Sequence, residues 1–514
     1  MSQITYRGNL SAKSFPFISD NWGRTVIVPG PDNTFNRQVS SEQDSDKDVG
    51  IPQIYYGHNV MPHAQGMQSV GYTPVIPGLS PFIGEFDHVL PIRDATGYKT
   101  YMGITRSGDI YVYTSPAGPA VPTVWTYMRS YPAGLLVTTA YVNGITYIFV
   151  AGQQCFRFDF GANNFINVVL TGLALATTYG IVGAAGYLIA WGLSAVAWSS
   201  TVDPTDFVPS LITGAGGGTV SDLKGTITVC AAHIQGFIVY GTENAVASIY
   251  SANARYPFNF RPITNSGGIG TPRYLAIDTN TGNHYAYTTY GMQSIATNGA
   301  QTIYPEITDF VAGKLFEDFN EMSQQFVLTP LTTTMRKTLG IISGRYLVIS
   351  YGVTNLTHAI VFDITQKRYG KLKIEHVDVF EYNYPSVVVT ETPRQSIGFV
   401  KANGEVQVVD FTVTSAGSNG VLLLGKYQYV RARLITLDTI DLENVQVGVA
   451  FSCTILTSVD GKNIYSTTTP TLLNGDGKLR RYGSRATGIN HSLLLQGAWH
   501  IESNVLVFNT HGKM

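Results

Sequence analysis

The chain has 514 residues, of which 44% are apolar and 13% are charged. This length exceeds what one ordinary core holds, so two or three domains are expected. The charged share is roughly half of the usual ~25%, which favours a surface covered in part by partners over a neutral β surface facing solvent. Basic and acidic residues nearly cancel, at 33 and 34 for a net charge of −1. A dedicated nucleic-acid binder is not expected, because such proteins carry a basic excess.

The cysteines and the N-terminus indicate the compartment of synthesis. Cys155, Cys230 and Cys453 lie far apart and include no C-x-x-C pair, so neither a disulfide framework nor a zinc site is expected. Residues 1–7 lack the apolar segment of a secretory signal. We therefore expect synthesis in a reducing compartment.

Residues 1–92 are irregular in sequence. Proline and glycine recur throughout this segment, and polar runs such as residues 40–48 dominate it. Such a segment can hardly build a core of its own. The sequence predicts an extended N-terminal arm that gains order by lying along another surface.

One acidic run within the arm is a weak calcium candidate. Asp44, Asp46 and Asp48 alternate as the carboxylates of a calcium loop do. An EF-hand also needs glycine at the sixth position and glutamate at the twelfth, where this chain has Val49 and Tyr55. A plain acidic loop is therefore the favoured interpretation.

Residues 93–415 contain a repeated hairpin pattern. In each unit a strand of alternating aromatic and β-branched residues is followed by a glycine turn and a second such strand. The spacing of about 40–60 residues is typical of propeller blades, whose ring leaves few exposed sheet edges. The pattern predicts an all-β protein with a β-propeller of about six or seven blades, and a stack of β-sandwiches is the alternative. The seven hairpins cover residues 97–113, 144–158, 186–198, 236–250, 284–295, 344–363 and 396–410.

Residues 168–198 resemble a membrane helix in hydropathy alone. No Asp, Glu, Lys or Arg occurs between Phe160 and Val202. Five glycines interrupt the stretch, and flanking Lys/Arg anchors are missing. We interpret it as two or three buried strands.

Two further elements are predicted beyond the hairpins. Leu315, Phe319 and Met322 lie at helical spacing, which predicts one short amphipathic helix. From residue 416 to 514 the strands lengthen, and this part is predicted to be a separate antiparallel β-sandwich.

The search for chemistry yields no catalytic, cofactor or metal site. Glu85, Asp87 and His88 cluster within four residues. On a strand the two carboxylates would share a face, and paired carboxylates can hydrolyse glycosides, but carboxylates this close in sequence are more typical of a solvated loop. The glycine-rich runs lack the Lys-Ser/Thr of a phosphate loop. His58 and His63 have no third ligand nearby in the sequence.

The segment 197–210 is the most specific feature of the chain. It reads Ala-Trp-Ser-Ser-Thr-Val-Asp-Pro-Thr-Asp-Phe-Val-Pro-Ser and precedes a glycine-rich loop. Asp203-Pro204 and Asp206 are expected to cap a tight turn, with Trp198 and Phe207 anchoring it in the blade. This segment resembles a propeller blade of the tail hub and nozzle proteins of short-tailed bacteriophages. Residues 458–463, 477–483 and 497–501 are similar to the C-terminal pattern of those proteins.

The resemblance covers roughly residues 95–514 and implies a structural, non-enzymatic role. It implies a homo-oligomeric ring, usually six-fold, placed below the adaptor ring of the portal and attached to tail fibre or spike proteins. Genomic DNA would pass through its lumen without specific binding, and the protein would be assembled in the host cytoplasm into the virion tail. A near-zero charge balance and 31 tyrosines suit a conduit with wide subunit contacts. The alternatives are a receptor-binding or tail-tip module, a propeller glycosidase or depolymerase, and a membrane pore.

Overall fold

The computed structural model of the chain is built almost wholly from antiparallel β-strands. No helix in its described part is long and apolar enough to cross a membrane. The charge-free stretch around residues 168–198 instead forms strands, as its glycines predicted. The structure describes residues 3–9, 53–63, 66–79, 84–93, 99–114, 124–252, 256–278, 281–303, 316–320, 325–329, 336–342, 345–352, 355–365, 368–383, 395–411, 420–427, 435–444, 449–458, 466–468, 473–475, 479–488 and 490–510.

Within these residues, seven groups of four strands follow one another, and we call them blades 1 to 7. Blade 1 is β6 (Phe86–Arg93), β7 (Lys99–Thr105), β8 (Asp109–Thr114) and β9 (Val124–Ser130); blade 2 is β10 (Val137–Val142), β11 (Ile145–Val150), β12 (Gln154–Asp159) and β13 (Asn164–Val168). Blade 3 is β14 (Gly180–Ala184), β15 (Tyr187–Trp191), β16 (Ala195–Trp198) and β17 (Gly216–Thr219); blade 4 is β18 (Ile227–His233), β19 (Gly236–Gly241), β20 (Ala245–Tyr250) and β21 (Phe258–Pro262). Blade 5 is β22 (Leu275–Ile277), β23 (His284–Thr288), β24 (Gly291–Ala296) and β25 (Gly299–Thr302); blade 6 is β28 (Arg336–Ile342), β29 (Tyr346–Gly352), β30 (Leu356–Asp363) and β31 (Arg368–His376). Blade 7 is β32 (Asp378–Asn383), β33 (Gln395–Val400), β34 (Val406–Asp410) and β5 (Gly71–Ile76).

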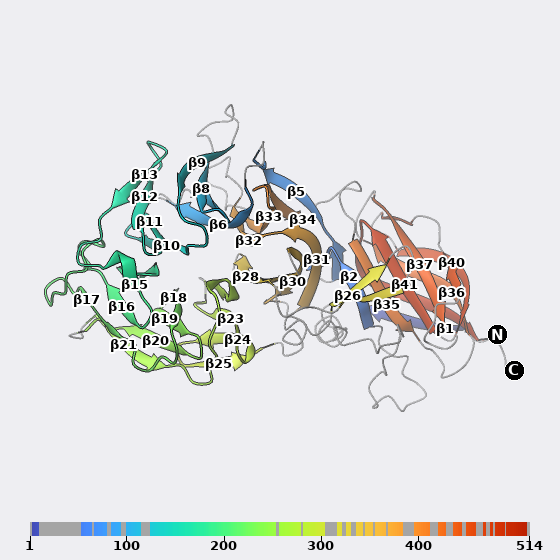
Figure 1. Cartoon of the computed structure of the whole chain (residues 1–514). Coiled ribbons are helices and arrows are strands. Elements are labelled where there is room, and N and C mark those ends of the chain that lie inside the picture. Colours follow the sequence, from blue (N-terminus) through green and yellow to red (C-terminus); the bar gives the residue numbers. More distant parts are fainter. Residues whose placement is uncertain are drawn as a thin grey trace.

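The blades stand around a common centre (Figure 1). The first strands of neighbouring blades contact one another, β10 with β6 and β14, β28 with β22 and β32, and β32 with β6. This arrangement confirms the predicted all-β, β-propeller-like fold. Each of the seven predicted hairpins forms the second and third strands of one blade.

The ring closes with a strand from the N-terminal part of the chain. β5 pairs antiparallel with β34, and Thr73 Oγ1 donates a 2.9 Å hydrogen bond to the Asp410 carboxylate. Blade 7 therefore combines strands that are more than 300 residues apart in sequence. This pairing joins the first and last parts of the propeller through a hydrogen-bonded ladder.

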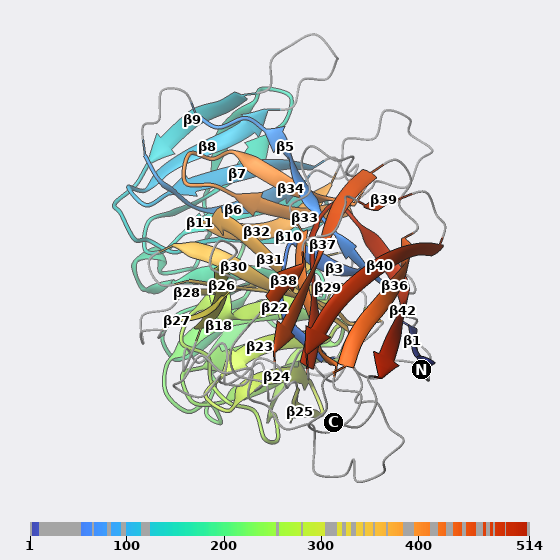
Figure 2. The same cartoon turned by 90° about the vertical axis from the view of Figure 1, so that its right-hand side faces the viewer.

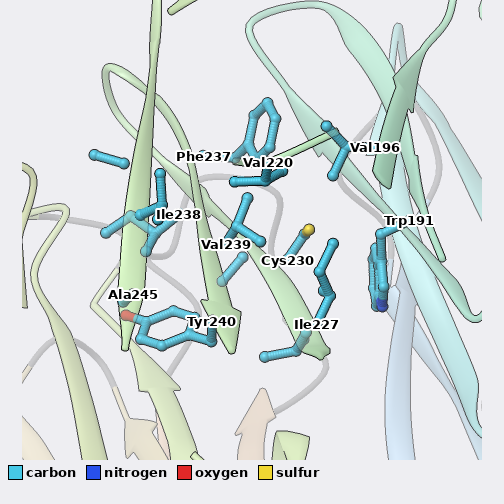
Figure 3. Packing of buried hydrophobic residues seen from close by; sticks show 14 of the residues in the cluster. Trp191, Val196, Val220, Ile227, Cys230, Phe237, Ile238, Val239, Tyr240 and Ala245 are labelled. Atoms are coloured by element: carbon cyan, nitrogen blue, oxygen red, sulfur yellow. The ribbon is translucent and has the colours of Figure 1, made fainter. Parts of the chain in front are cut away.

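The apolar core lies between the blades rather than in one central mass. Each buried cluster joins neighbouring blades, as where Trp191 and Val196 of blade 3 pack toward Cys230 and Phe237 of blade 4 (Figure 3). The seam between blades 7 and 1 is aromatic, with Tyr101 stacked on Tyr382 at 5.7 Å. Successive side chains along a strand point to opposite faces of the blade. Each blade can therefore bury apolar side chains against both of its neighbours.

Two larger antiparallel sheets form the C-terminal sandwich, seen at the front of Figure 2. One contains β2 (Gln53–His58), β35 (Gly420–Tyr427), β41 (Asn490–Gly497), β37 (Val449–Ser458), β38 (Ser466–Thr468) and β39 (Leu473–Gly475). The other contains β40 (Leu479–Gly488), β36 (Ile435–Asn444), β42 (His500–Thr510), β1 (Gln3–Asn9), β4 (Gly66–Ser69) and β3 (Val60–His63). Through β3, which pairs with β31, the second sheet is continuous with blade 6.

The structure differs from the sequence-based expectations at two places. Residues predicted to form a helix instead contribute β26 (Phe316–Asn320), which pairs with β27 (Gln325–Thr329), because pairing with a neighbouring strand overrides a short helical pattern. The described part of the predicted arm does lie along other surfaces, but they are those of its own chain. Its strands β1 to β6 enter the sandwich and blades 7 and 1, so strands of the propeller begin at Gly71, ahead of residue 93.

Candidate functional site

A cavity of about 990 Å³ lies among the first strands of the blades. Its lining comes from β6, β10, β14, β18, β22 and β32, which belong to blades 1 to 5 and 7. Much of the wall is apolar, as at Leu90, Ile181 and Val229. A cavity of this size is within the range of small-molecule sites, about 300–1,000 Å³.

Four polar side chains meet on one part of this wall, and we call them the cavity cluster: Asp87, His88, Arg273 and Asp378. Asp87 and His88 begin blade 1, and Asp378 is the first residue of blade 7. Arg273 comes from blade 5, where the short 3-10 helix η2 (Pro272–Tyr274) precedes β22. The Thr271 side chain accepts from the Arg273 backbone N–H and so caps this turn.

The Arg273 guanidinium forms the centre of the cavity cluster. Its Nη2 donates to the Asp87 carboxylate and, at 3.2 Å, to the Asp87 backbone oxygen. The same nitrogen lies 3.3 Å from His88 Nδ1, which is 3.1 Å from Asp87 Oδ2. These contacts join blades 5 and 1, which are not neighbours in the ring.

Asp378 is the most buried member, with 7% of its surface exposed. Its Oδ2 accepts a 2.9 Å hydrogen bond from the Val89 N–H. Loss of hydration raises the pKa of Asp378, and the nearby positive charge of Arg273 opposes this rise. A buried carboxyl group with a shifted pKa beside an ion pair is typical of a functional site.

The sequence identified two of the four cluster residues. Asp87 and His88 do meet, but Glu85 is separated from them and pairs with Arg106 instead. Glu85 precedes β6, and the register of β6 shifts between Phe86 and His88, so the two carboxylates are not paired along one regular strand, the arrangement that the sequence analysis had disfavoured. No local sequence pattern marks Arg273 or Asp378 as a site residue. They lie in blades 5 and 7 and come near Asp87 only because the blades form a ring.

The segment of the resemblance lies in the loop between β16 and β17, residues 199–215. Trp198 is buried at the end of β16, and its Nε1 donates a 2.9 Å hydrogen bond to the Gly214 oxygen. Phe207 is buried against blades 2 and 3, and its N–H donates to the Thr171 oxygen at 2.8 Å. The loop is thus held at its start by Trp198 in one inter-blade core and near its middle by Phe207 in the next.

Side chains within this loop cap its turns. Asp203 Oδ1 accepts from the Thr205 N–H and hydroxyl at 2.9 and 2.7 Å, and these bonds lower the pKa of Asp203. Asp206 Oδ1 accepts from the Val208 N–H at 2.9 Å. Pro204 stands between these two caps and is half-buried. These hydrogen bonds therefore define the backbone conformation of the loop.

The outer face of this loop carries exposed apolar side chains. Val202, Leu211 and Ile212 are 84%, 74% and 97% exposed. Ser210 Oγ accepts from the N–H groups of Ile212 and Thr213, which fixes the tip that carries Leu211 and Ile212. Val169, from the adjoining turn of blade 2, is also exposed. We call Val169, Val202, Leu211 and Ile212 the apolar loop patch.

The weak calcium candidate of the sequence is not tested by the structure. Asp44, Asp46 and Asp48 lie outside the described residues. His58 is in β2 and His63 ends β3. In the part of the chain that the structure describes, no three His, Cys, Asp or Glu side chains are grouped so as to hold a metal ion.

Comparisons with known proteins identify no family for this chain. No protein-family model matches the sequence, and no curated protein matches it either. Among solved structures, the chain is similar to the extracellular domain of a protein designated a hybrid two component system from B. thetaiotaomicron, with 12% identity and a TM-score of 0.37. The match covers 80% of this chain and 49% of the other, so this chain spans about half the length of that structure. A likeness this distant carries no argument about function.

Proposed function

We propose that the protein is a structural subunit of a bacteriophage tail that assembles into a homo-oligomeric ring, a nozzle or hub. In this role it would form part of the conduit for DNA ejection and a platform for the portal adaptor and for tail fibre or spike proteins. The proposal of a tail protein rests on the sequence resemblance around Trp198 and Phe207. The assembly expected from that resemblance is a six-fold ring.

The apolar loop patch is the observation that carries this proposal. Leu211 and Ile212 are almost fully exposed, yet the loop beneath them is fixed by the Ser210 side chain and by the anchors Trp198 and Phe207. Exposed apolar groups on a rigid support are typical of protein interaction sites. Of the patch residues, Val202 lies within the segment 197–210 that resembles the tail proteins, and Leu211 and Ile212 follow that segment directly.

Charge is the second support for an assembling subunit. Only 13% of residues are charged and the net charge is −1. Wide subunit interfaces are depleted of charge at their centres and enriched in tyrosine, and this chain has 31 tyrosines. A conduit should also avoid basic groups that hold phosphates, because each such contact slows the release of DNA.

The test is the oligomeric state of the full chain as concentration rises, by light scattering after size exclusion and by electron microscopy. We expect rings, with six subunits as the expected number. The double variant Leu211→Ser/Ile212→Ser should keep its thermal stability and shift the equilibrium toward smaller species. A strict monomer at the highest concentration, both alone and mixed with tail components, would contradict the proposal.

A matched control uses apolar side chains that are exposed elsewhere on the propeller. Ile234 and Tyr290 are also largely exposed, on turns of blades 4 and 5. The variant Ile234→Ser/Tyr290→Ser removes similar apolar area and should leave the rings intact. If both double variants dissociate the rings equally, the patch is not specific. Binding of the monomer to intact host cells would instead favour the receptor-binding or tail-tip alternative.

A further inference from the structure

The cavity cluster has hydrogen-bonding capacity that the protein itself does not use. Arg273 makes its contacts with Asp87 and His88 through Nη2, and no partner for its Nε or Nη1 is found among the described residues. The Nε2 of His88 also lacks a partner there. The side chains of Arg273 and Asp87 are 27% and 25% exposed. A molecule in the cavity can therefore reach these groups.

The charges around the cavity cancel. Its charged lining residues comprise three acidic and three basic side chains: Asp87, Asp378, Glu381, Arg93, Arg106 and Arg273. Arg273 is already neutralised by Asp87 through a direct ion pair. A free anion would gain little from this wall, and a cation would meet Arg273 at the centre of the cluster. The lining favours a ligand without net charge.

The same wall offers both kinds of hydrogen-bonding group. Arg273 supplies N–H donors, whereas the Asp87 carboxylate supplies acceptors. Between these polar groups the wall is apolar, as at Leu90, Val89 and Phe380. A ligand that matches it must donate and accept hydrogen bonds along its edges and present C–H groups on its faces.

From this match we propose that the central cavity is a binding site for a neutral sugar, a monosaccharide or short oligosaccharide, held by Arg273, Asp87 and His88. A sugar ring carries hydroxyl groups that both donate and accept, and its ring faces are apolar. The inter-blade cores are apolar, and the four residues of the cavity cluster are not members of them. The inference stands apart from the proposed tail function and does not depend on it.

The experiment is saturation-transfer difference NMR on the full chain. The probes are glucose, galactose, N-acetylglucosamine and maltose, with adenosine and inorganic phosphate as comparison ligands. We expect saturation transfer to at least one sugar with a Kd of about 1 mM, and none to phosphate. Saturation transfer to adenosine or phosphate, without transfer to any sugar, would overturn the proposal. The absence of saturation transfer to every probe would overturn it as well.

Variants place the binding in the cavity. Arg273→Met keeps the aliphatic stem and removes the donors, so it should weaken sugar binding about tenfold or more. Arg129→Met is the matched control, because Arg129 bonds to Asn167 on the outer strands of blades 1 and 2, away from the cavity lining. It should leave binding unchanged.

A second variant covers the case in which Arg273→Met does not fold. His88→Phe keeps a ring of similar size and removes Nε2, and it should also weaken binding while the thermal unfolding midpoint stays close to that of the wild type. Sugar binding that is unaffected in every folded cluster variant would place the ligand elsewhere and overturn the proposal.

Discussion

Ser69 and Trp499 exchange hydrogen bonds across 430 positions of sequence. The Trp499 N–H donates to Ser69 Oγ at 2.7 Å, and the Ser69 N–H and hydroxyl both donate to the Trp499 oxygen, at 2.8 and 3.1 Å. Ser69 ends β4, two residues before β5 of blade 7, whereas Trp499 lies between β41 and β42 of the sandwich. This contact lies within the sandwich and fixes the end of β4, which leads directly into β5 of blade 7, to the turn before β42.

The first prediction concerns this joint. Ser69→Ala leaves buried groups of Trp499 short of a partner, so the free energy of unfolding should fall by about 1–3 kcal/mol. Urea titration followed by tryptophan fluorescence measures the change. Ser221→Ala, at an exposed position, is the control and should change stability little. Equal stability of the two variants would mean that the joint contributes nothing.

The second prediction concerns the contact between blades 2 and 3. A Cβ added to Gly183 of β14 would lie 2.4 Å from the backbone oxygen of Tyr141 in β10. Backbone cannot yield as a flexible side chain does, so Gly183→Ala should destabilise the protein by about 1–3 kcal/mol. Gly218→Ala adds the same methyl group where no atom lies within 4 Å. Thermal unfolding should separate the two variants, and coincident midpoints would contradict the close packing of the blades.

The third prediction is a loss of stability in acid that originates at two buried histidines. His284 accepts from the Tyr240 hydroxyl and donates to the Ala232 oxygen, and His376 is held between Ser350 and the Ile374 oxygen. Burial lowers the pKa of each from 6.5 to about 4. Because the folded pKa is the lower one, this stability is complete above pH 6.5 and is lost as the pH falls toward 4, by about 3 kcal/mol for each histidine.

Urea titrations at a series of pH values test this loss. His284→Gln and His376→Gln should lower stability at neutral pH, because they disturb buried hydrogen bonds, and should flatten its decline below pH 6.5. A decline as steep as that of the wild type in both variants would assign the acid sensitivity to other groups.

The fourth prediction has the opposite sign of pH dependence. Burial raises the pKa of Asp378 above its ordinary value of 3.8. The folded state therefore holds this proton more tightly than the unfolded state, and the contribution of Asp378 to stability falls as the pH rises from 3.8 through the raised pKa. Asp378→Asn cannot ionise and escapes this loss. Its stability relative to the wild type should increase as the pH rises above 3.8, measured by urea titration. A relative stability that does not change with pH would mean that Asp378 titrates normally.

The fifth prediction concerns the thiols. All three cysteines are buried, and burial raises the pKa of Cys155 and of Cys453 to about 12. Since the thiolate is the reactive form, a colorimetric disulfide reagent should label none of them in the native protein at neutral pH. All three should react once the chain is unfolded. Rapid labelling of the native protein would show that the blade or sheet around the labelled cysteine opens readily.

The sequence determined the hairpins of the propeller because their signals are local. Alternating side chains and a glycine at the turn define a strand pair within fifteen to twenty residues, as from Gly236 to Tyr250. The caps of the β16–β17 loop are local for the same reason, since Asp203 bonds to a residue two positions away. The helix predicted from the apolar spacing around Phe319 was wrong. A short local pattern does not show that a neighbouring strand will pair with the same segment.

Only the tertiary structure decided how distant segments combine. The pairing of β5 with β34, the joint of Ser69 with Trp499, and the meeting of Asp87 with Arg273 each cross 186 positions of sequence or more. No periodicity marks such contacts, because they are fixed by the order of blades in a closed ring and by the shared burial of their faces. The apolar loop patch is decided in the same way. Leu211 and Ile212 differ from core residues only in where the anchors Trp198 and Phe207 hold their loop.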